Sequence, residues 1–276
     1  MSSDLSVLHA IVLGLVEGLT EFLPISSTGH LLVAQRVLGL GGTEDADMAL
    51  DTYAICIQAG AIAAVLVLYR QRIAQLVQGL GGRSEDGRRL LIALVAAFIP
   101  AAAIGVALSD PIRSALFGVG PVAGAWIVGG LAILWVTRKP WSNGGTATLE
   151  ELTVRHALII GLAQALALWP GVSRSLVTIL AGLALGYTMR AAVEFSFLLG
   201  LVTLTAATAY EGVRSGGQLV DTFGVATPLL GLAVAFVSAV LAVRWMVSWL
   251  QSRGLAVFGW YRIAIGVVAV TAIALG

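Results

Sequence analysis

Six long apolar stretches constrain the fold of this chain more than any other feature of its sequence. Each runs for about twenty residues, the length that a helix needs to cross the hydrocarbon core of a bilayer. Hydrophobic residues make up 58% of the chain and Asp, Glu, Lys and Arg only 11%, which excludes a soluble globular fold. We therefore predict six membrane-spanning helices, at residues 50–69, 90–108, 119–137, 193–210, 225–243 and 257–275.

Two further apolar regions, residues 5–38 and 154–187, are longer than one span and are interrupted in the middle. The interruptions, residues 24–30 and 170–175, contain Pro, Gly and Ser. Irregular backbone at membrane depth is tolerated only where protein or a water-filled cavity satisfies its amide groups. We expect both regions to form re-entrant helical hairpins whose loops line a cavity. The predicted fold class is an all-α polytopic membrane protein.

The two broken regions align with each other at a constant offset. Residues 11–28 match residues 158–175, and the identities include Ser26 with Ser173. Each half of the chain then continues with three spans, which predicts an inverted-topology repeat whose two loops meet near the bilayer midplane. The repeats cover about residues 5–137 and 154–275 of a single membrane domain, residues 1–276.

Basic residues predict the orientation of the chain. Five arginines lie in the loop of residues 70–89, and short cytoplasmic loops carry the excess of Arg and Lys. If both broken regions turn back without crossing, Arg190 and Arg253 fall on this same side, and both termini lie outside. The net charge of +1 gives no reason to expect nucleic acid as a partner.

Glu17 and Glu21 are four residues apart inside the first broken region and therefore share one helical face. Two carboxylates this close repel each other unless they share a proton or a divalent cation. Mg²⁺ or Ca²⁺ prefers oxygen ligands and would in turn hold phosphate oxygens. The alternative is a pair of polar residues that line a transport path or are buried against an arginine.

The loop that follows contains three hydroxyls and an imidazole, in Ser26, Ser27, Thr28 and His30. Hydroxyls and backbone N–H groups at the start of a half-helix form a cradle for an anion. Ser27 is a candidate nucleophile if His30 takes its proton, and their spacing permits contact across a turn. The alternative is a simple helix cap with a structural histidine.

The second interruption places Arg174 between Ser173 and Ser175. In the repeat alignment Arg174 stands where Ser27 does, so a cation replaces the hydroxyl of the first loop. A guanidinium with flanking hydroxyls is suited to bidentate recognition of phosphate. The alternative is an ion pair with Glu17 or Glu21, and the two roles can coexist.

Two other charged residues within apolar stretches remain. Glu194 is expected either near the loops or at the membrane interface. Arg262 lies close enough to a helix end for its side chain to snorkel to the interface, and we predict that it does so.

These residues resemble a known family. Residues 17–30, Glu-Gly-Leu-Thr-Glu-Phe-Leu-Pro-Ile-Ser-Ser-Thr-Gly-His, and residues 170–175, Pro-Gly-Val-Ser-Arg-Ser, with Thr178, are similar to the two signature motifs of bacterial undecaprenyl-diphosphatases of the bacitracin-resistance type. Both motifs are long and specific, and the likeness extends over essentially the whole chain. One departure is Leu176, where family members commonly have glycine.

The resemblance implies an enzyme of the bacterial inner membrane that hydrolyses undecaprenyl diphosphate, a long-chain polyprenyl diphosphate, to the monophosphate and phosphate. The reaction recycles the lipid carrier of peptidoglycan synthesis. The resemblance also implies an active site open to the periplasmic side and a need for Mg²⁺ or Ca²⁺; a homodimer stays open. Carried over by motif position, Glu17 and Glu21 are the metal residues, Ser27, His30, Glu21 and Arg174 the catalytic residues, and Glu17, Ser26, Thr28, Ser173, Ser175 and Thr178 the substrate-binding residues.

Two questions stay open from the sequence. Either Ser27 attacks the terminal phosphate or His30 activates a water directly. The rival function is a secondary transporter or flippase of polyprenyl phosphate lipids, because inverted repeats and broken helices are equally natural there. A nucleophile beside a base favours the enzyme, because a transporter needs only to bind the anion.

Overall fold

The computed structural model describes residues 5–139, 141 and 145–275, and the regular secondary structure of this part is helical. Within it, six helices are long and apolar enough to cross a membrane, and they coincide with the six predicted spans. This confirms the predicted class of an all-α polytopic membrane protein. The six helices are α3 (Glu44–Leu68), α5 (Glu85–Leu116), α6 (Val119–Val136), α9 (Met189–Phe223), α10 (Ala226–Arg253) and α11 (Ala256–Leu275).

Both predicted interruptions are present, but each begins and ends earlier than expected: the irregular residues are 21–26 and 169–173, and residues 27–30 and 174–175 already belong to the following helices. Each broken region forms a helix, an irregular loop and then a second helix of 11 residues. A short helix, α4 (Arg70–Leu80), follows α3 outside the spans, and a 3₁₀ turn, η2 (Leu149–Glu151), precedes the second broken region. The helices of the broken regions are α1 (Val7–Thr20) and α2 (Ser27–Val37), then α7 (Val154–Gln164), the 3₁₀ turn η3 (Ala165–Leu168) and α8 (Arg174–Ala184).

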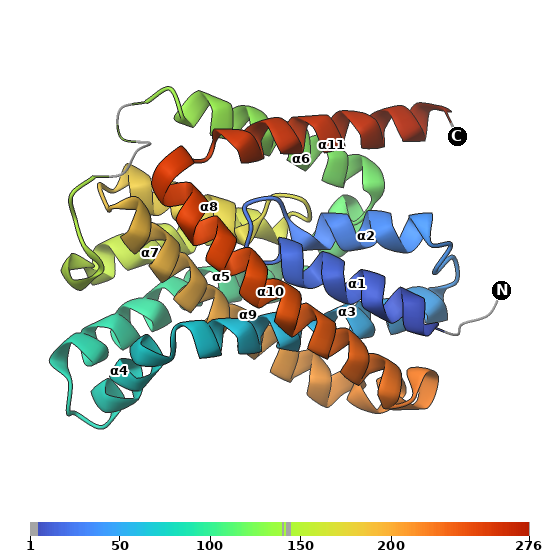
Figure 1. Cartoon of the computed structure of the whole chain (residues 1–276), viewed down its shortest axis with the longest axis horizontal. Coiled ribbons are helices and arrows are strands. Elements are labelled where there is room, and N and C mark those ends of the chain that lie inside the picture. The colour runs from blue at the N-terminus through green and yellow to red at the C-terminus, as the bar shows by residue number, and fades with distance from the viewer. Residues whose placement is uncertain (1–4, 140, 142–144, 276) are drawn as a thin grey trace.

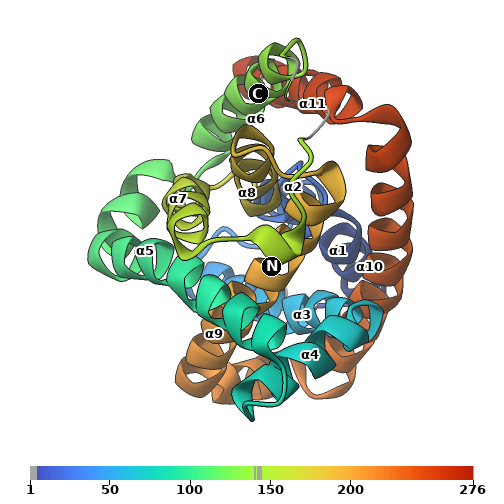
Figure 2. The same cartoon turned by 90° about the vertical axis from the view of Figure 1, so that its left-hand side faces the viewer.

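The two broken regions approach each other from opposite ends of the molecule. In Figure 1 the α1–α2 pair lies to the right and the α7–α8 pair to the left, with both loops near the centre. Helix α1 packs along α10, and α7 packs along α5. At Gly18 of α1 an added Cβ would collide with the Ala235 carbonyl of α10, so this contact requires a residue without a side chain. The longer helices surround α2 and α8 when seen along the long axis (Figure 2).

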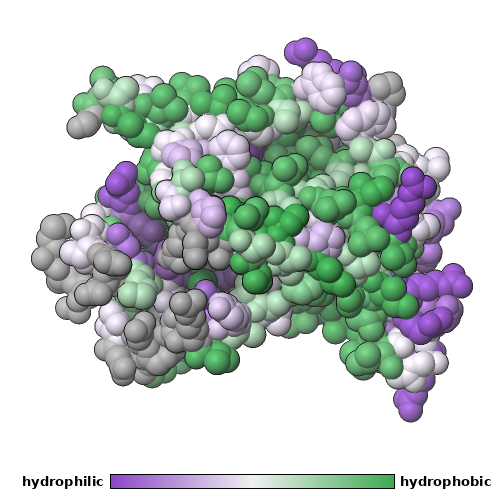
Figure 3. Space-filling view, turned by 180° about the vertical axis from the view of Figure 1, so that it is seen from behind, coloured by the Kyte–Doolittle hydropathy of each residue, from purple (hydrophilic) through white to green (hydrophobic). Residues whose placement is uncertain are grey.

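Apolar side chains form both the interior and much of the surface. Phe22, Leu23 and Ile25 of the first loop are buried in the same core as Leu176 and Ile179 of α8, so Leu176 is accommodated without difficulty. A broad apolar area covers the middle of the molecule, while hydrophilic side chains gather at the α4 end (Figure 3, right). Such an exposed apolar surface suits lipid rather than water. The re-entrant topology and the inverted repeat stay predictions.

Candidate active site

Ser26 and Ser173 adopt the same unusual backbone conformation at the starts of α2 and α8. Their φ angles are 73° and 67°, and they are the positive-φ residues other than glycine in the described part of the chain. A side chain makes this region of φ unfavourable, at a cost of about 1–3 kcal/mol for each residue. The surrounding contacts must therefore hold both loops in place.

Side-chain donors hold the backbone of the first loop. The carbonyl oxygens of four successive residues, 23–26, each accept a hydrogen bond from a side chain on a different helix. Because unpaired carbonyls at membrane depth are costly, these four bonds explain how a non-helical segment is tolerated there. Ser175 Oγ donates to Leu23 (2.9 Å), Arg262 Nη1 to Pro24 (3.3 Å), Trp126 Nε1 to Ile25 (2.9 Å) and His30 Nδ1 to Ser26 (2.6 Å).

Arg262 connects the two loops, so the prediction that it snorkels to the interface was wrong. Its side chain is fully buried, and besides the Pro24 carbonyl it binds the carbonyls of Ala125 (2.9 Å) and Gly171 (2.8 Å). Gly171 belongs to the second loop and Ala125 to α6. A single guanidinium thus fixes both loops against α6, and the sequence signal for this role was a cation inside an apolar span.

We expect Arg262→Met to lower kcat by about 10-fold to 100-fold. Without the guanidinium the two loops can shift, and a shift of about 1 Å is enough to misplace the reacting groups. Arg262→Lys can bind fewer carbonyls than arginine, so its kcat should lie between those of Arg262→Met and the wild type. Arg244→Met is the control, since Arg244 is an exposed arginine of the neighbouring helix α10. Steady-state kinetics on purified protein measure the effect, and a wild-type kcat for Arg262→Met would contradict the role.

Ser27, Glu21 and Arg174 form a continuous polar chain between the two loops. The Ser27 hydroxyl donates a hydrogen bond to Glu21 Oε2, and Arg174 Nη2 donates to Glu21 Oε1 at 3.1 Å. The side chains of Arg174 and Glu21 are only 10% and 6% exposed. The ion pair with Glu21, which the sequence left as one role of Arg174, is therefore present, and it leaves Ser27 beside a carboxylate.

His30 lies close to this group but makes different contacts from those expected. Because its Nδ1 binds a carbonyl, Nδ1 carries the proton, and Nε2 contacts the Tyr261 hydroxyl of α11 at 2.8 Å. Both ring nitrogens are occupied, and Ser27 donates to Glu21 rather than to His30. In this arrangement His30 holds the Ser26 backbone, and Glu21 is the proton acceptor next to Ser27.

The position of Arg174 depends on helix α9. Arg174 Nη1 donates to the Ser196 carbonyl at 3.1 Å, and the guanidinium carbon lies 5.5 Å from the centre of the Phe22 ring. An added Cβ at Gly200 of α9 would collide with the guanidinium. Gly200 therefore leaves the space that Arg174 occupies, a requirement that appears only when α8 and α9 pack together.

We expect Gly200→Ala to displace Arg174 and lower kcat about 10-fold or more. Gly212→Ala, in the same helix, is the matched control, because nothing lies within 4 Å of a Cβ added there. Comparison of kcat for the two variants checks this. Equal activity of both variants would show that Arg174 does not need the space at Gly200.

Glu17 lies one turn before Glu21, as predicted, since the Glu21 N–H donates to the Glu17 carbonyl at 2.9 Å. Its side chain is 1% exposed, and Oε1 has no hydrogen-bond partner among the described residues. No group of three or more His, Cys, Asp or Glu side chains suited to a metal occurs in the described part. The chain therefore offers two carboxylates, one with a free oxygen, and a cation would take its other ligands from phosphate or water.

The other predicted substrate-binding hydroxyls divide into two groups. Ser26, Ser173 and Thr28 line the cavity at the loops. Ser175 and Thr178 are buried and bind protein groups instead: Ser175 the Leu23 carbonyl, and Thr178 the Arg174 carbonyl at 2.8 Å and the Ser196 hydroxyl at 2.7 Å. These contacts hold the loops, and a substrate contact for Ser175 or Thr178 stays a prediction.

Two cavities meet at Ser27 and Thr28, which line both. The first, about 860 Å³, extends from Glu17 to polar side chains at the start of α3, including Asp47 and Asp51. The second, about 480 Å³, begins at Glu21 and Arg174 and continues between apolar side chains of α5, η3 and α9. This arrangement suits a molecule with a charged head and a hydrocarbon tail. The apolar walls include Phe98, Ala101, Val106, Leu168 and Leu204.

Comparisons with known proteins find related sequences over most of the chain. The family model described as bacitracin resistance protein BacA matches residues 10–268. A protein of Sorangium cellulosum named undecaprenyl-diphosphatase is 46% identical, over 93% of this chain and 83% of the relative. Undecaprenyl-diphosphatase 1 of Chromobacterium violaceum is 44% identical over 94% of both chains, and undecaprenyl-diphosphatase of Methylococcus capsulatus is 42% identical over 96% of this chain and 94% of its own.

Proposed function

Because this chain belongs to the bacitracin resistance protein BacA family, we propose that it hydrolyses undecaprenyl diphosphate to undecaprenyl phosphate and inorganic phosphate. This reaction returns the lipid carrier of peptidoglycan synthesis, and bacitracin resistance follows from the family. One observation carries the assignment. Ser27, bound to Glu21, stands where a polar cavity meets an apolar one, so it can face the diphosphate of a lipid whose chain lies in the apolar cavity.

The contacts of Ser27 support covalent catalysis. Ser27 Oγ attacks the terminal phosphorus while its proton passes to Glu21, the bond to the bridging oxygen breaks, and undecaprenyl phosphate leaves with that proton on its released oxygen. Glu21, ionised again, takes a proton from the water that attacks the phosphoserine and returns it to Ser27 Oγ as inorganic phosphate leaves. Arg174 stabilises charge on the phosphoryl oxygens, aided by the N-termini of α2 and α8. The alternative, a water activated by His30, has less support because both His30 nitrogens already have partners.

Glu17 and Glu21 fit a hard divalent cation. The buried Oε1 atom of Glu17 has no hydrogen-bond partner among the described residues, so it is available as a ligand for a cation. Glu21 lies one helical turn away and can supply a second carboxylate ligand. Bound Mg²⁺ or Ca²⁺ would neutralise charge on the diphosphate. Without it, the two neighbouring glutamates would have to share a proton instead.

We expect removal of divalent cations with EDTA to lower phosphate release by about 100-fold or more, and Mg²⁺ or Ca²⁺ to restore it. The second readout is cation binding by calorimetry, which Glu17→Gln should weaken about 10-fold or more even without substrate. Full activity in EDTA after extensive dialysis would exclude the metal.

The orientation of the site follows from charge. The polar cavity reaches acidic side chains at the start of helix α3. Arg70, Arg72 and Arg83 follow the opposite end of this helix, which is Leu68. Basic loops face the cytoplasm, so the polar cavity opens to the periplasmic side of the inner membrane. The homodimer stays a prediction.

Phosphate release separates the enzyme from its rival, a transporter or flippase. The purified protein in detergent, given undecaprenyl diphosphate and Mg²⁺, is expected to release inorganic phosphate with multiple turnovers. A folded protein that binds the lipid but releases no phosphate would reverse the assignment in favour of transport.

A further inference from the structure

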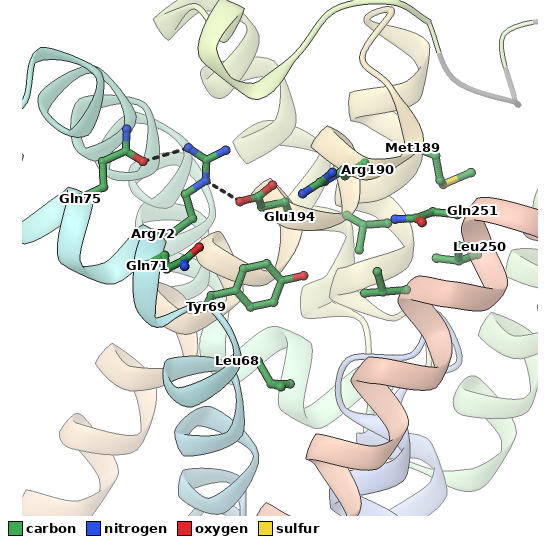
Figure 4. A pocket seen from close by; sticks show the side chains of 12 residues that line it. Leu68, Tyr69, Gln71, Arg72, Gln75, Met189, Arg190, Glu194, Leu250 and Gln251 are labelled. Carbon is green, nitrogen blue, oxygen red and sulfur yellow. Dashed lines mark hydrogen bonds and ion pairs between the residues drawn. The ribbon is translucent and has the colours of Figure 1, made fainter.

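A third cavity, of about 620 Å³, lies between the α3–α4 corner, α9 and α10 (Figure 4). It adjoins Leu68 at the end of α3, whereas the polar cavity of the active site adjoins Asp51 near the beginning of this helix. Seventeen residues of helix separate these two positions, about 25 Å at 1.5 Å per residue. The third cavity is therefore remote from the mouth of the active site.

Aromatic side chains separate this cavity from the catalytic loops. Tyr69, in its wall, contacts Phe197 edge to face, with ring centres 5.9 Å apart, and Phe197 contacts Phe22 in the same way at 5.2 Å. Phe22 and Phe197 are fully buried, and Arg174 lies beyond Phe22. The cavity is a distinct site and not an extension of the active site.

Two arginines of the cavity are in different electrostatic states. Arg72 binds Glu194 (2.6 Å), Gln75 (2.8 Å) and Glu150 (2.9 Å), so this one cation already faces two carboxylates. The hydrogen bond from Arg72 holds the pKa of the Glu150 carboxyl below its usual value, which keeps this carboxylate ionised. Arg190 makes no hydrogen bond or ion pair with any described residue, although its guanidinium points into the cavity near Glu194 (Figure 4). Arg190 is the cation available to a ligand.

Further hydrogen-bond donors surround the free guanidinium. The amides of Gln71 and Gln251 and the Tyr69 hydroxyl line the cavity, and they have no hydrogen-bond partner among the described residues. The remaining wall is apolar and includes Val193 and Leu250. These features fit a singly charged, acceptor-rich group that is attached to hydrocarbon.

We propose that this cavity binds the phosphate of an anionic membrane lipid, with the phosphodiester on Arg190 and the acyl chain against the apolar wall. Arginine suits phosphate oxygens because its donors form a planar fork. Basic pockets between membrane helices recognise anionic head groups in this way. Free phosphate shares the head-group chemistry but makes no use of the apolar wall.

Native mass spectrometry of the full-length protein in detergent tests the proposal. We expect dioleoylphosphatidylglycerol to bind the wild type, and Arg190→Gln to raise its Kd by about fivefold or more. Arg253→Gln should leave the Kd within about twofold of the wild type, since Arg253 lies at the same end of the molecule but stacks on Trp249 outside the cavity. Gln251→Leu is a second variant on another helix, with a smaller increase expected.

Two further titrations identify the source of the phosphate. Dioleoylphosphatidylcholine has the same phosphodiester but no net charge, so it should bind the wild type more weakly than phosphatidylglycerol does, and Arg190→Gln should raise its Kd by a smaller factor. Equal binding of phosphatidylglycerol to the wild type, Arg190→Gln and Gln251→Leu would overturn the proposal. Inorganic phosphate is the ligand instead if it raises the melting temperature of the wild type but not of Arg190→Gln while phosphatidylglycerol binds neither protein. That result would overturn the proposal of a lipid.

Discussion

Ser27→Ala is expected to lower kcat for undecaprenyl diphosphate by about 10⁴-fold or more, because it removes the nucleophile itself. The KM should change little, since Arg174 and the helix N-termini still bind the diphosphate. The alanine side chain fits the space, and Glu21 keeps its ion pair with Arg174, so the protein should stay folded. Phosphate release by the purified variant in detergent measures the effect.

Ser252→Ala is the matched control for Ser27→Ala. The Ser252 hydroxyl is exposed at the end of α10 and binds the Ser248 carbonyl of its own helix, so its loss should leave kcat unchanged. A Ser27→Ala variant that retains more than about a tenth of the wild-type kcat would favour direct attack by water instead.

Arg174→Ala is expected to lower kcat by about 10³-fold, because the charge on the transferred phosphoryl group loses its main stabilising side chain. It should also destabilise the fold by roughly 3–5 kcal/mol, because Glu21 would stay buried without its partner. Arg174→Lys keeps the charge but loses the two-sided contact with Glu21 and Ser196, so an intermediate kcat is expected. Kinetics and thermal unfolding report the two effects separately.

The double variant Glu21→Gln with Arg174→Ala distinguishes the two roles of Arg174. Removing the buried carboxylate charge should recover stability relative to Arg174→Ala alone. Activity should not recover with it, because both the base and the phosphate ligand are then missing. Recovery of activity together with stability would mean that Arg174 only holds the fold.

The spans and the breaks could be predicted from the sequence because they depend on local composition. An apolar run of about 20 residues has few alternatives to a membrane helix, and the six runs match the six helices. The interruptions at residues 24–30 and 170–175 stood out because proline, glycine and serine broke these runs. The meeting of the two loops followed from the repeat alignment, and the contact of Arg174 with Glu21 is consistent with it.

The partners inside the site could not be predicted, because they come from helices far away in the sequence. Arg262 binds Pro24 across 238 residues, and Tyr261 binds His30 across 231. The spacing of Ser27 and His30 permitted a contact, but the imidazole nitrogens of His30 bind the Ser26 carbonyl and the Tyr261 hydroxyl instead. Proximity in sequence showed which groups share a loop, and only packing decided which of them are bonded.

Capture of the covalent intermediate tests the central claim most directly. Wild-type protein is mixed with undecaprenyl diphosphate labelled on the terminal phosphate, quenched in acid during the first turnover, digested and analysed for labelled peptides. The account predicts phosphoserine at Ser27 in the wild type, and no labelled peptide in Ser27→Ala. Release of labelled phosphate at the full rate, with no label on the protein at any time in the first turnover, would contradict it.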